Sequence, residues 1–317
     1  PFRAFVGDKL PSSQRTTGFA TQTFFIGLGA VIASLLPYIF TNYLNISNTA
    51  PEGVISDSVK YSFYIGAVVF LFSVLWTVFT TKEFPPENIE SWAQEKLKTK
   101  GLMHGFAEIT TGIFKMPPTM LQLAIVQFFT WLAFFAMWIY TTSGIAQNAF
   151  GTTDTTSKTF QDAGDWVGVM FMVYNGVSAI TAFLLPMLAK RIGRKYTHMI
   201  CLIIGGIGLV SMLFIESKMM LLLPMVGVGL AWSSTLTMPY AILAGALPAS
   251  KMGFYMGVFN FFIVIPQILA AAILGFFVKT MFNEQGIYAL VIGGISMIIA
   301  GLLNIIVKDK DDEKLIK

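Results

Sequence analysis

Hydrophobic and polar positions alternate along this chain in long blocks rather than singly. Eight blocks are almost wholly apolar, and each extends over about 20 residues or more, the length that an α-helix needs to cross the hydrocarbon core of a bilayer. Backbone in lipid has to satisfy its own hydrogen bonds, so these blocks should be transmembrane helices. They lie at residues 18–40, 61–81, 120–142, 166–188, 196–215, 219–243, 252–280 and 287–307.

The polar segments between these blocks differ in their content of Lys and Arg. Basic residues gather before residue 18, in segment 82–119, in the turn 189–195 and after residue 307. The segments 41–60 and 143–165 carry mainly acidic residues instead. Because Lys and Arg concentrate in the cytoplasmic loops of membrane proteins, the basic segments predict the cytoplasmic side, and both ends of the chain fall there.

Two distant stretches of the chain resemble each other. Residues 1–26 and 239–263 share, in the same order, Pro followed by an aromatic residue, a Gly, Leu-Pro-x-Ser, a second Gly and Phe-Phe-Ile. Six predicted spans separate the two copies, so the repeating unit is six spans long. This predicts a protein of twelve spans, with four helices expected before Pro1 and eight visible here.

The repeat divides the chain into predicted parts. Residues 1–81 should end an N-terminal six-helix half, and 120–307 should form the C-terminal half. Between them lies a cytoplasmic loop, 82–119, and 308–317 form a cytoplasmic tail. Within the loop, 87–97 has the pattern of a short amphipathic surface helix, which would serve as a solvated linker or contact lipid.

Composition agrees with a membrane protein and argues against other classes. The chain is 55% hydrophobic and 12% charged, with a mean hydropathy of +0.69, too apolar for a soluble domain of 317 residues. The net charge of +4 does not suggest a nucleic-acid partner, because Lys and Arg in short loops more often set the orientation of the protein in the membrane. Cys201, the only cysteine, should be a packing residue. With no G-x-S-x-G, H-E-x-x-H, C-x-x-C or P-loop pattern, we expect no enzyme, catalytic residue, metal or cofactor.

Uncharged polar residues inside the spans are the candidate chemistry. Asn260 and Gln267 are seven residues apart on one helix face, beside Pro266, which should kink the helix. Taken together, neutral amides and hydroxyls beside an aromatic ring are typical of a sugar-binding site. Taken singly, each of these residues could instead serve packing between helices. The further members of this set are Gln122, Gln127, Asn175, Ser233, Ser234, Thr235 and Thr237, together with Trp131, Trp138 and Trp232.

Ionisable residues are absent from the middle of every predicted span, which favours a neutral substrate. A coupling proton or sodium ion would then bind in the four expected helices, or at Asp8, Asp162 or Asp165 near helix ends. His104 and His198 are predicted in or beside cytoplasmic loops. Arg3 either faces a cavity at the end of a span or pairs with Asp8 in a loop.

Several motifs resemble those of known transporters. The turn Lys190-Arg191-Ile192-Gly193-Arg194-Lys195 is similar to the R-x-G-R-[RK] signature of the major facilitator superfamily, although Lys190 stands where the signature has an acid. Topogenic anchoring alone would also explain this basic turn. Three further stretches resemble motifs of the glycoside-pentoside-hexuronide cation symporters, and within that family those of the sucrose/maltose transporter branch. They are residues 1–8, 229–241 and 257–267, and the stretch 257–267 reads GVFNFFIVIPQ.

This resemblance implies an all-α membrane protein of the major facilitator fold that takes up an α-glucoside with protons by alternating access. It implies that Arg3 contacts the substrate or the coupling carboxylate. The plant branch has acidic residues after its seventh helix, but residues 141–147 contain none, so its substrate range does not transfer directly.

We therefore expect a multi-pass protein of the bacterial inner membrane or a plasma membrane, whose partners are a neutral sugar of maltose or sucrose type, a proton or sodium ion, and the lipid bilayer. The predicted substrate residues are Arg3, Asn175, Asn260 and Gln267, with Trp232 as a sugar platform and Asp8 in coupling. Two alternatives stay open: the same fold carrying a lysolipid or drug, and a non-transporting receptor or scaffold.

Overall fold

The computed structural model describes residues 6, 9–11, 14–51, 53–81, 116–247 and 252–309. Eight helical spans in this part of the chain are long and apolar enough to cross a membrane, as the sequence predicts. Secondary structure in the described residues is helical, with no strand among them. Arg3, Asp8 and the predicted surface helix at 87–97 lie outside the described residues.

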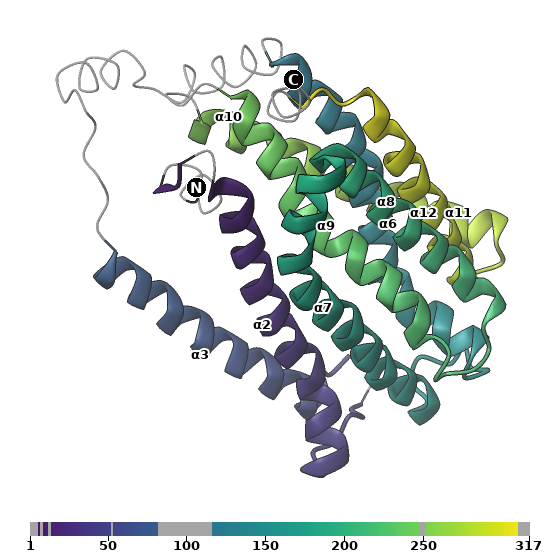
Figure 1. The fold of residues 1–317 in the computed structure, drawn as a ribbon. Helices are drawn as coiled ribbons and strands as arrows, with labels where there is room; N and C mark the ends of the chain where they lie inside the picture. The colour runs from purple at the N-terminus through teal and green to yellow at the C-terminus, as the bar shows by residue number, and fades with distance from the viewer. Residues whose placement is uncertain are drawn as a thin grey trace, which may run out of the picture.

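The helices form an elongated bundle, with one helix diverging from it (Figure 1). Several helices extend beyond the predicted blocks, because polar residues at their ends continue the helix after the apolar stretch stops. In chain order they are α2 (Arg15–Tyr43), α3 (Asp57–Thr80), α6 (Pro118–Asn148), α7 (Lys158–Ile192), α8 (Arg194–Ser211), α9 (Leu222–Ala246), α10 (Met252–Phe259), α11 (Phe261–Met281) and α12 (Ile287–Leu303), with 3-10 turns η2 (Met212–Phe214) and η4 (Asn304–Ile306).

Helix α7 shows why hydropathy alone misses the helix ends. It begins at Lys158, eight residues before the predicted start at residue 166. Ser157 is its N-cap and accepts a hydrogen bond from the backbone N–H of Phe160 at 3.2 Å. A capping Ser satisfies one of the free N–H groups of the first turn, so the helix starts at the cap rather than at the first apolar run.

The seventh span is interrupted at Asn260, a break that the sequence does not predict, and the kink expected at Pro266 stays a prediction. Helix α10 ends at Phe259, Asn260 forms a turn, and α11 runs uninterrupted through Pro266. The backbone N–H of Asn260 bonds to Gly257 O at 3.1 Å, and that of Ile263 bonds to Asn260 O at 3.0 Å. These i to i−3 bonds wind the chain more tightly than an α-helix, which explains the break.

Helix α9 is the centre of the bundle, because nearly all of its side chains from Pro224 to Ala244 are buried. Small residues let neighbouring helices approach closely. A Cβ on Gly206 of α8 would lie 2.6 Å from the carbonyl oxygen of Gly294 in α12. This contact confirms the close packing expected of small residues in a membrane helix. Cys201 is buried and free, as predicted for a packing residue.

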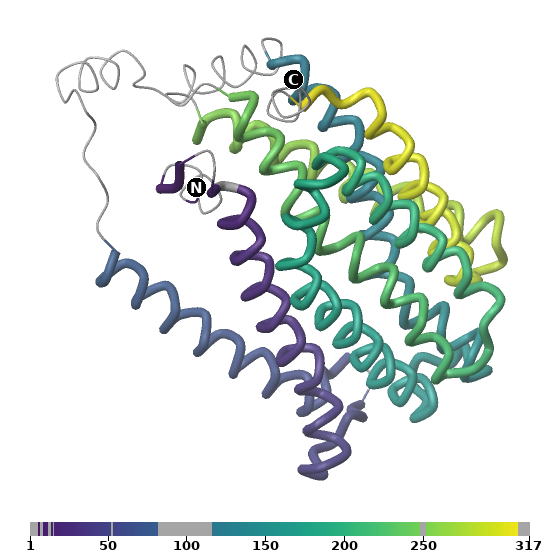
Figure 2. The backbone as a smooth tube through the Cα atoms, in the orientation of Figure 1, coloured from purple at the N-terminus to yellow at the C-terminus, as the bar shows by residue number. Residues whose placement is uncertain are grey.

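Helix α2 runs along α7 and reaches α9, joining segments far apart in the sequence (Figure 2). Phe19 packs against Tyr240 with ring centroids 6.0 Å apart. One turn further along α2, the hydroxyls of Thr23 and Thr237 lie 3.1 Å apart, and both side chains are fully buried. At the other end of the interface, Asn48 donates a hydrogen bond to Asp165 at 2.8 Å.

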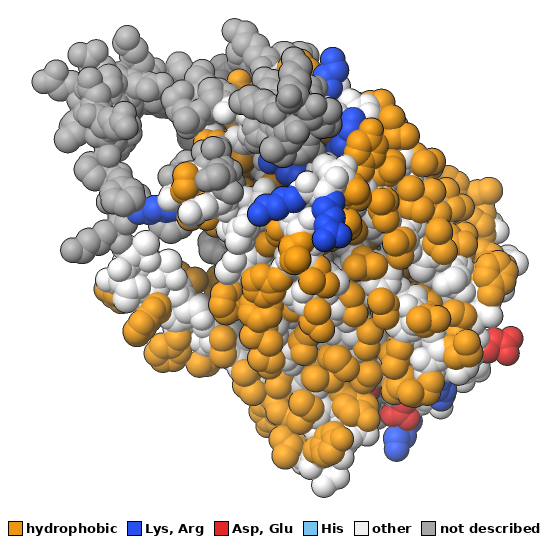
Figure 3. Space-filling view, in the orientation of Figure 1, with side chains coloured by type: hydrophobic (Ala, Val, Ile, Leu, Met, Phe, Trp, Pro, Cys, Tyr) orange, Lys and Arg blue, Asp and Glu red, His pale blue; other side chains and the backbone are white. Residues whose placement is uncertain are grey.

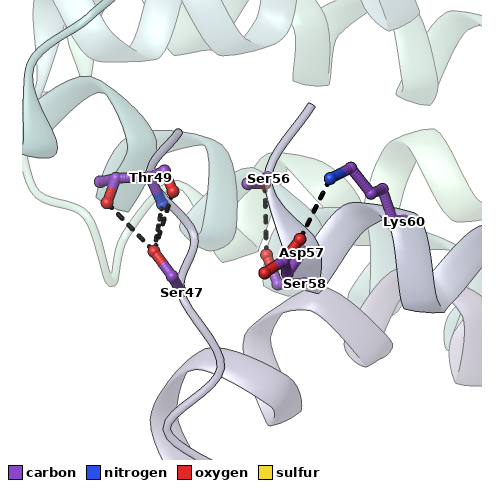
Figure 4. A network of polar contacts seen from close by, with 6 residues as sticks. All are labelled: Ser47, Thr49, Ser56, Asp57, Ser58 and Lys60. Carbon is purple, nitrogen blue, oxygen red and sulfur yellow. Dashed lines mark hydrogen bonds and ion pairs between the residues drawn. The ribbon is translucent and has the colours of Figure 1, made fainter. Parts of the chain in front are cut away.

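Helix α3 packs weakly on the described part of the chain, since Ser58 is its only buried residue there. The connection between α2 and α3 is ordered by short polar contacts (Figure 4). Ser47 bonds to Thr49, and Lys60 pairs with Asp57 at 3.1 Å in the first turn of α3. An exposed pair of this kind contributes little to stability but matches the negative charge to the helix N-terminus.

The basic turn between α7 and α8 contains a buried ion pair. Gly193 has φ of 88°, a conformation that favours glycine, and it joins the two helices directly. Arg194 follows it, donates from both Nε and Nη2 to the carboxylate of Asp309, and donates from Nη1 to Ala241 O at 3.2 Å. The acid missing at Lys190 is therefore not required for an ion pair here, because the carboxylate comes from the segment after α12.

Candidate substrate site

Four aromatic side chains meet inside the bundle where α6 faces α9. Trp131, Phe134 and Trp138 belong to α6, and Trp232 belongs to α9. The ring centroid of Trp232 lies 5.8 Å from that of Trp131, 5.0 Å from that of Phe134 and 5.5 Å from that of Trp138. The interplanar angles are 82°, 69° and 87°, the edge-to-face geometry that aromatic pairs favour. We call these four residues the aromatic cluster.

The sequence places these rings on one face of α6. Gln127, Trp131, Phe134 and Trp138 are spaced by four, three and four residues, which is the spacing of a single helical stripe. Gln127 therefore extends the stripe by one turn toward the start of α6. The stripe consists of one amide and three rings.

Helix α7 supplies the neighbouring wall. A Cβ at Gly229 of α9 would lie 2.6 Å from Tyr174 O, so glycine is needed for α7 to approach this closely. The approach allows the indole N–H of Trp138 to donate to the Tyr174 hydroxyl at 3.2 Å. The site is thus bounded by three helices, α6, α7 and α9.

Several buried polar atoms around the cluster have no hydrogen-bond partner in the described part of the chain. They are both side-chain amide atoms of Gln127 and the indole nitrogens of Trp131 and Trp232, with the hydroxyl of Ser233 next to Trp232 in the sequence. Gln127 is fully buried, and both indoles are more than nine-tenths buried. An unpaired buried polar group costs about 1–3 kcal/mol, so these atoms are expected to bind a partner from outside the protein, such as a water molecule or a ligand.

Asn175, a predicted substrate residue, lies at the edge of this site. It follows Tyr174 in α7 and is buried, and its amide donates to Phe171 O at 2.9 Å. Its backbone oxygen faces Gly27 of α2, where an added Cβ would lie 3.0 Å away. Trp232, the predicted sugar platform, is within the aromatic cluster.

The other predicted residues lie elsewhere. Asn260 is exposed at the break between α10 and α11, and Gln267 is partly exposed on α11. Neither is joined to the aromatic cluster by a hydrogen bond recorded among the described residues. Arg3 and Asp8 fall outside the part of the chain that the structure describes.

Sequence reasoning missed Phe134 and Tyr174, although the helical stripe through Trp131 and the position beside Asn175 are visible signals. Other polar residues of the predicted set have structural partners. Gln122 accepts from the backbone N–H of Lys308 at 2.9 Å, and Thr235 donates to Ala231 O at 2.8 Å. These two residues therefore hold the fold together rather than the site.

His198 lies one turn into α8, beside the turn at Gly193, as predicted. Its side chain is fully buried, with Nδ1 2.8 Å from the hydroxyl of Ser234. The described residues contain no group of His, Cys, Asp and Glu that could hold a metal ion.

These features define a class: a multi-pass integral membrane protein made of apolar helices, with a cluster of aromatic rings buried between them. The profile of the Major Facilitator Superfamily matches residues 1–271 and 145–316. The chain belongs to this superfamily of transporters, as its sequence motifs predict.

Its curated relatives include plant sucrose transport proteins. The chain is 23% identical to sucrose transport protein SUC4 of Arabidopsis thaliana over 335 residues, covering 96% of this chain and 64% of that protein. It is 24% identical over 280 residues to sucrose transport protein SUT5 of the indica and japonica subspecies of Oryza sativa, covering 78% of this chain and 51% of theirs. The chain thus spans between half and two thirds of the length of these relatives.

Proposed function

We propose that this protein is a secondary active transporter that moves a neutral disaccharide of the maltose or sucrose type together with protons, by alternating access. The observation that carries the proposal is the aromatic cluster with its unpaired buried amide and indole groups. Sugar rings have apolar faces that stack on aromatic side chains and hydroxyls that need neutral hydrogen-bond partners. The names of the plant relatives support the same class of substrate.

Within this proposal, Trp232 stacks on a sugar ring while Gln127 and the indole N–H groups bind its hydroxyls. Asn175 adds an amide at the edge toward α2. Arg3, Asn260 and Gln267 remain predicted substrate residues, and Asp8 a predicted coupling residue, with sodium as the alternative ion. The parts 1–81 and 120–307 would rock against each other along α2 and α7 to expose the site to each side in turn.

A lysolipid or drug as cargo is less well supported, because a long acyl chain gains nothing from the amide and indole groups that lack protein partners. The test of the proposal is uptake by the full-length protein in proteoliposomes, with labelled maltose, sucrose and glucose and an imposed proton gradient. The proposal expects gradient-driven accumulation of a disaccharide. If folded protein accumulates none of these sugars under a proton or a sodium gradient, it is wrong.

A further inference from the structure

The turn between α7 and α8 carries an unusual concentration of positive charge. Lys190 and Arg191 end α7, and Arg194 and Lys195 begin α8, with only Ile192 and Gly193 between them. Arg194 is buried and held by Asp309. In the described residues the other three make no ion pair; Lys190 and Arg191 are exposed, and Lys195 is partly exposed.

Among the described residues, the acidic groups other than Asp309 lie at the opposite ends of the helices. Asp162 and Asp165 are near the start of α7, Glu216 follows α8, and Glu284 precedes α12. In Figure 3 most of the blue side chains gather at one end of the molecule, beside the grey segment, and the red ones are at the other. By the positive-inside rule the basic end faces the cytoplasm.

An apolar surface continues directly from the basic turn toward the bilayer centre. On α8, Tyr196, Ile200 and Ile204 are exposed and spaced by four residues, which places them on one face of the helix. On α7, Met187 and Leu188 are exposed one turn before the basic residues. Orange side chains cover this region below the blue ones in Figure 3.

We propose that the turn and these two helix faces form a docking surface for a phospholipid with an anionic headgroup, from the cytoplasmic leaflet. Lys190, Arg191 and Lys195 bind the headgroup phosphate. The acyl chains lie along Tyr196, Ile200 and Ile204 of α8 and the exposed end of α7. Charge complementarity favours this occupant, because the surface joins cations that make no ion pair to an exposed apolar strip. Within the described residues the one carboxylate beside it, that of Asp309, is already paired with Arg194.

The ammonium of Lys195 shows how the surface is arranged in the protein alone. It lies 5.0 Å from the centroid of the Tyr196 ring and 3.4 Å from Ile305 O, at the limit of a hydrogen bond. Both contacts are weak, so a phosphate can recruit this side chain without breaking a strong interaction. The proposal does not depend on what the protein transports.

The test measures lipid binding to the full-length protein by native mass spectrometry in detergent. The probes are phosphatidylglycerol and phosphatidylcholine with the same acyl chains, and inorganic phosphate alone. The triple variant Lys190→Gln, Arg191→Gln, Lys195→Gln is compared with the triple variant Lys60→Gln, Lys158→Gln, Lys218→Gln, which removes the same charge at the opposite end of the helices. All six side chains lie outside the proposed sugar site.

The proposal predicts that wild type and the control variant prefer phosphatidylglycerol, whereas the basic-turn variant loses this preference by about tenfold or more, since each Lys or Arg near an anionic lipid surface contributes roughly a fivefold factor. Phosphate alone should not displace the lipid, because it lacks acyl chains. Equal preference in all three proteins, equal loss in both variants, or full displacement by phosphate would each overturn it. Unchanged melting temperatures in phosphatidylcholine show that the variants fold.

Discussion

At the scale of single residues, Gln122 and Gln127 show how the same side chain serves two purposes. Both lie in α6, five residues apart. Gln122 accepts a hydrogen bond from the backbone of Lys308, so it joins the start of α6 to the segment after α12. Gln127 is fully buried and its amide has no partner in the described residues. A group that destabilises the fold in this way is expected where a ligand is bound.

This contrast gives a prediction for Gln127→Met. Replacing an unpaired buried amide by an apolar side chain of similar shape should raise the free energy of unfolding by about 1 kcal/mol, because the desolvation cost disappears. The same change should weaken sugar binding about tenfold, because one hydrogen bond to the sugar is lost. Thermal unfolding and equilibrium binding of the same samples measure the two effects.

The matched control is Gln122→Met, which should lower the melting temperature and leave sugar affinity unchanged. If Gln127→Met destabilised the protein and left affinity intact, the amide would be a structural residue with a partner in the native state. It would then be removed from the site.

At the scale of elements, the segment after α12 fastens the ends of three helices together. Asp309 pairs with Arg194 at the start of α8, and Arg194 also bonds to Ala241 O near the end of α9. The backbone oxygen of Lys308 accepts from Thr119 at the start of α6 at 3.0 Å. The ion pair is buried, so its loss should be costly even though the pair itself contributes little net stability.

We therefore predict that Asp309→Asn lowers the free energy of unfolding by about 3 kcal/mol, because it leaves the charge of Arg194 buried and uncompensated. The double change Arg194→Met with Asp309→Leu should recover most of this loss. Asp57→Asn, which removes an exposed pair with Lys60, should cost less than 1 kcal/mol. Chemical denaturation of the purified variants measures these free energies of unfolding. A loss of stability in Asp309→Asn no larger than that in Asp57→Asn would contradict the prediction.

The sequence predicts elements of this fold better than it predicts the site. Eight spans follow from apolar length alone, since an uninterrupted apolar run of about 20 residues crosses lipid as a helix, which satisfies its own backbone hydrogen bonds. The interruption at Asn260 was not predicted, because Pro266 is the stronger signal and the tight winding through Gly257 is a local conformation that periodicity does not report. The partnership of Arg194 with Asp309 joins residues 115 positions apart, and no local pattern encodes it.

The site shows the same limit. The stripe through Trp131 and Trp138 can be predicted from the residue spacing in α6. Which residues of α7 and α9 face this stripe depends on how those two helices cross. Gly229 permits that close approach, and its role appears only once the helices are packed. Burial of Gln127, as opposed to pairing of Gln122, likewise depends on tertiary contacts and could not be predicted from residue type.

At the scale of the whole molecule, α2 connects the predicted N-terminal part to α7 and α9. The hydroxyls of Thr23 and Thr237 meet across this interface, near the ring contact of Phe19 with Tyr240. If the two parts rock against each other during transport, these contacts must open and close. A covalent link at this point should therefore stop the cycle.

We predict that Thr23→Cys with Thr237→Cys, in a protein carrying Cys201→Ala, forms a disulfide on mild oxidation and stops sugar uptake. Reduction should restore uptake, because the link holds one conformation without removing a site residue. Each single cysteine variant is the control and should be insensitive to oxidation. Full uptake by the cross-linked protein would show that this interface does not move.

The central claim is that the aromatic cluster binds a sugar, and the most direct measurement is disaccharide affinity by isothermal titration calorimetry of the full-length protein. Trp232→Leu is compared with Trp76→Leu, which removes an exposed indole from α3. The account predicts that Trp232→Leu weakens binding about tenfold or more, while Trp76→Leu binds as wild type does. Wild-type affinity in a folded Trp232→Leu protein would contradict it.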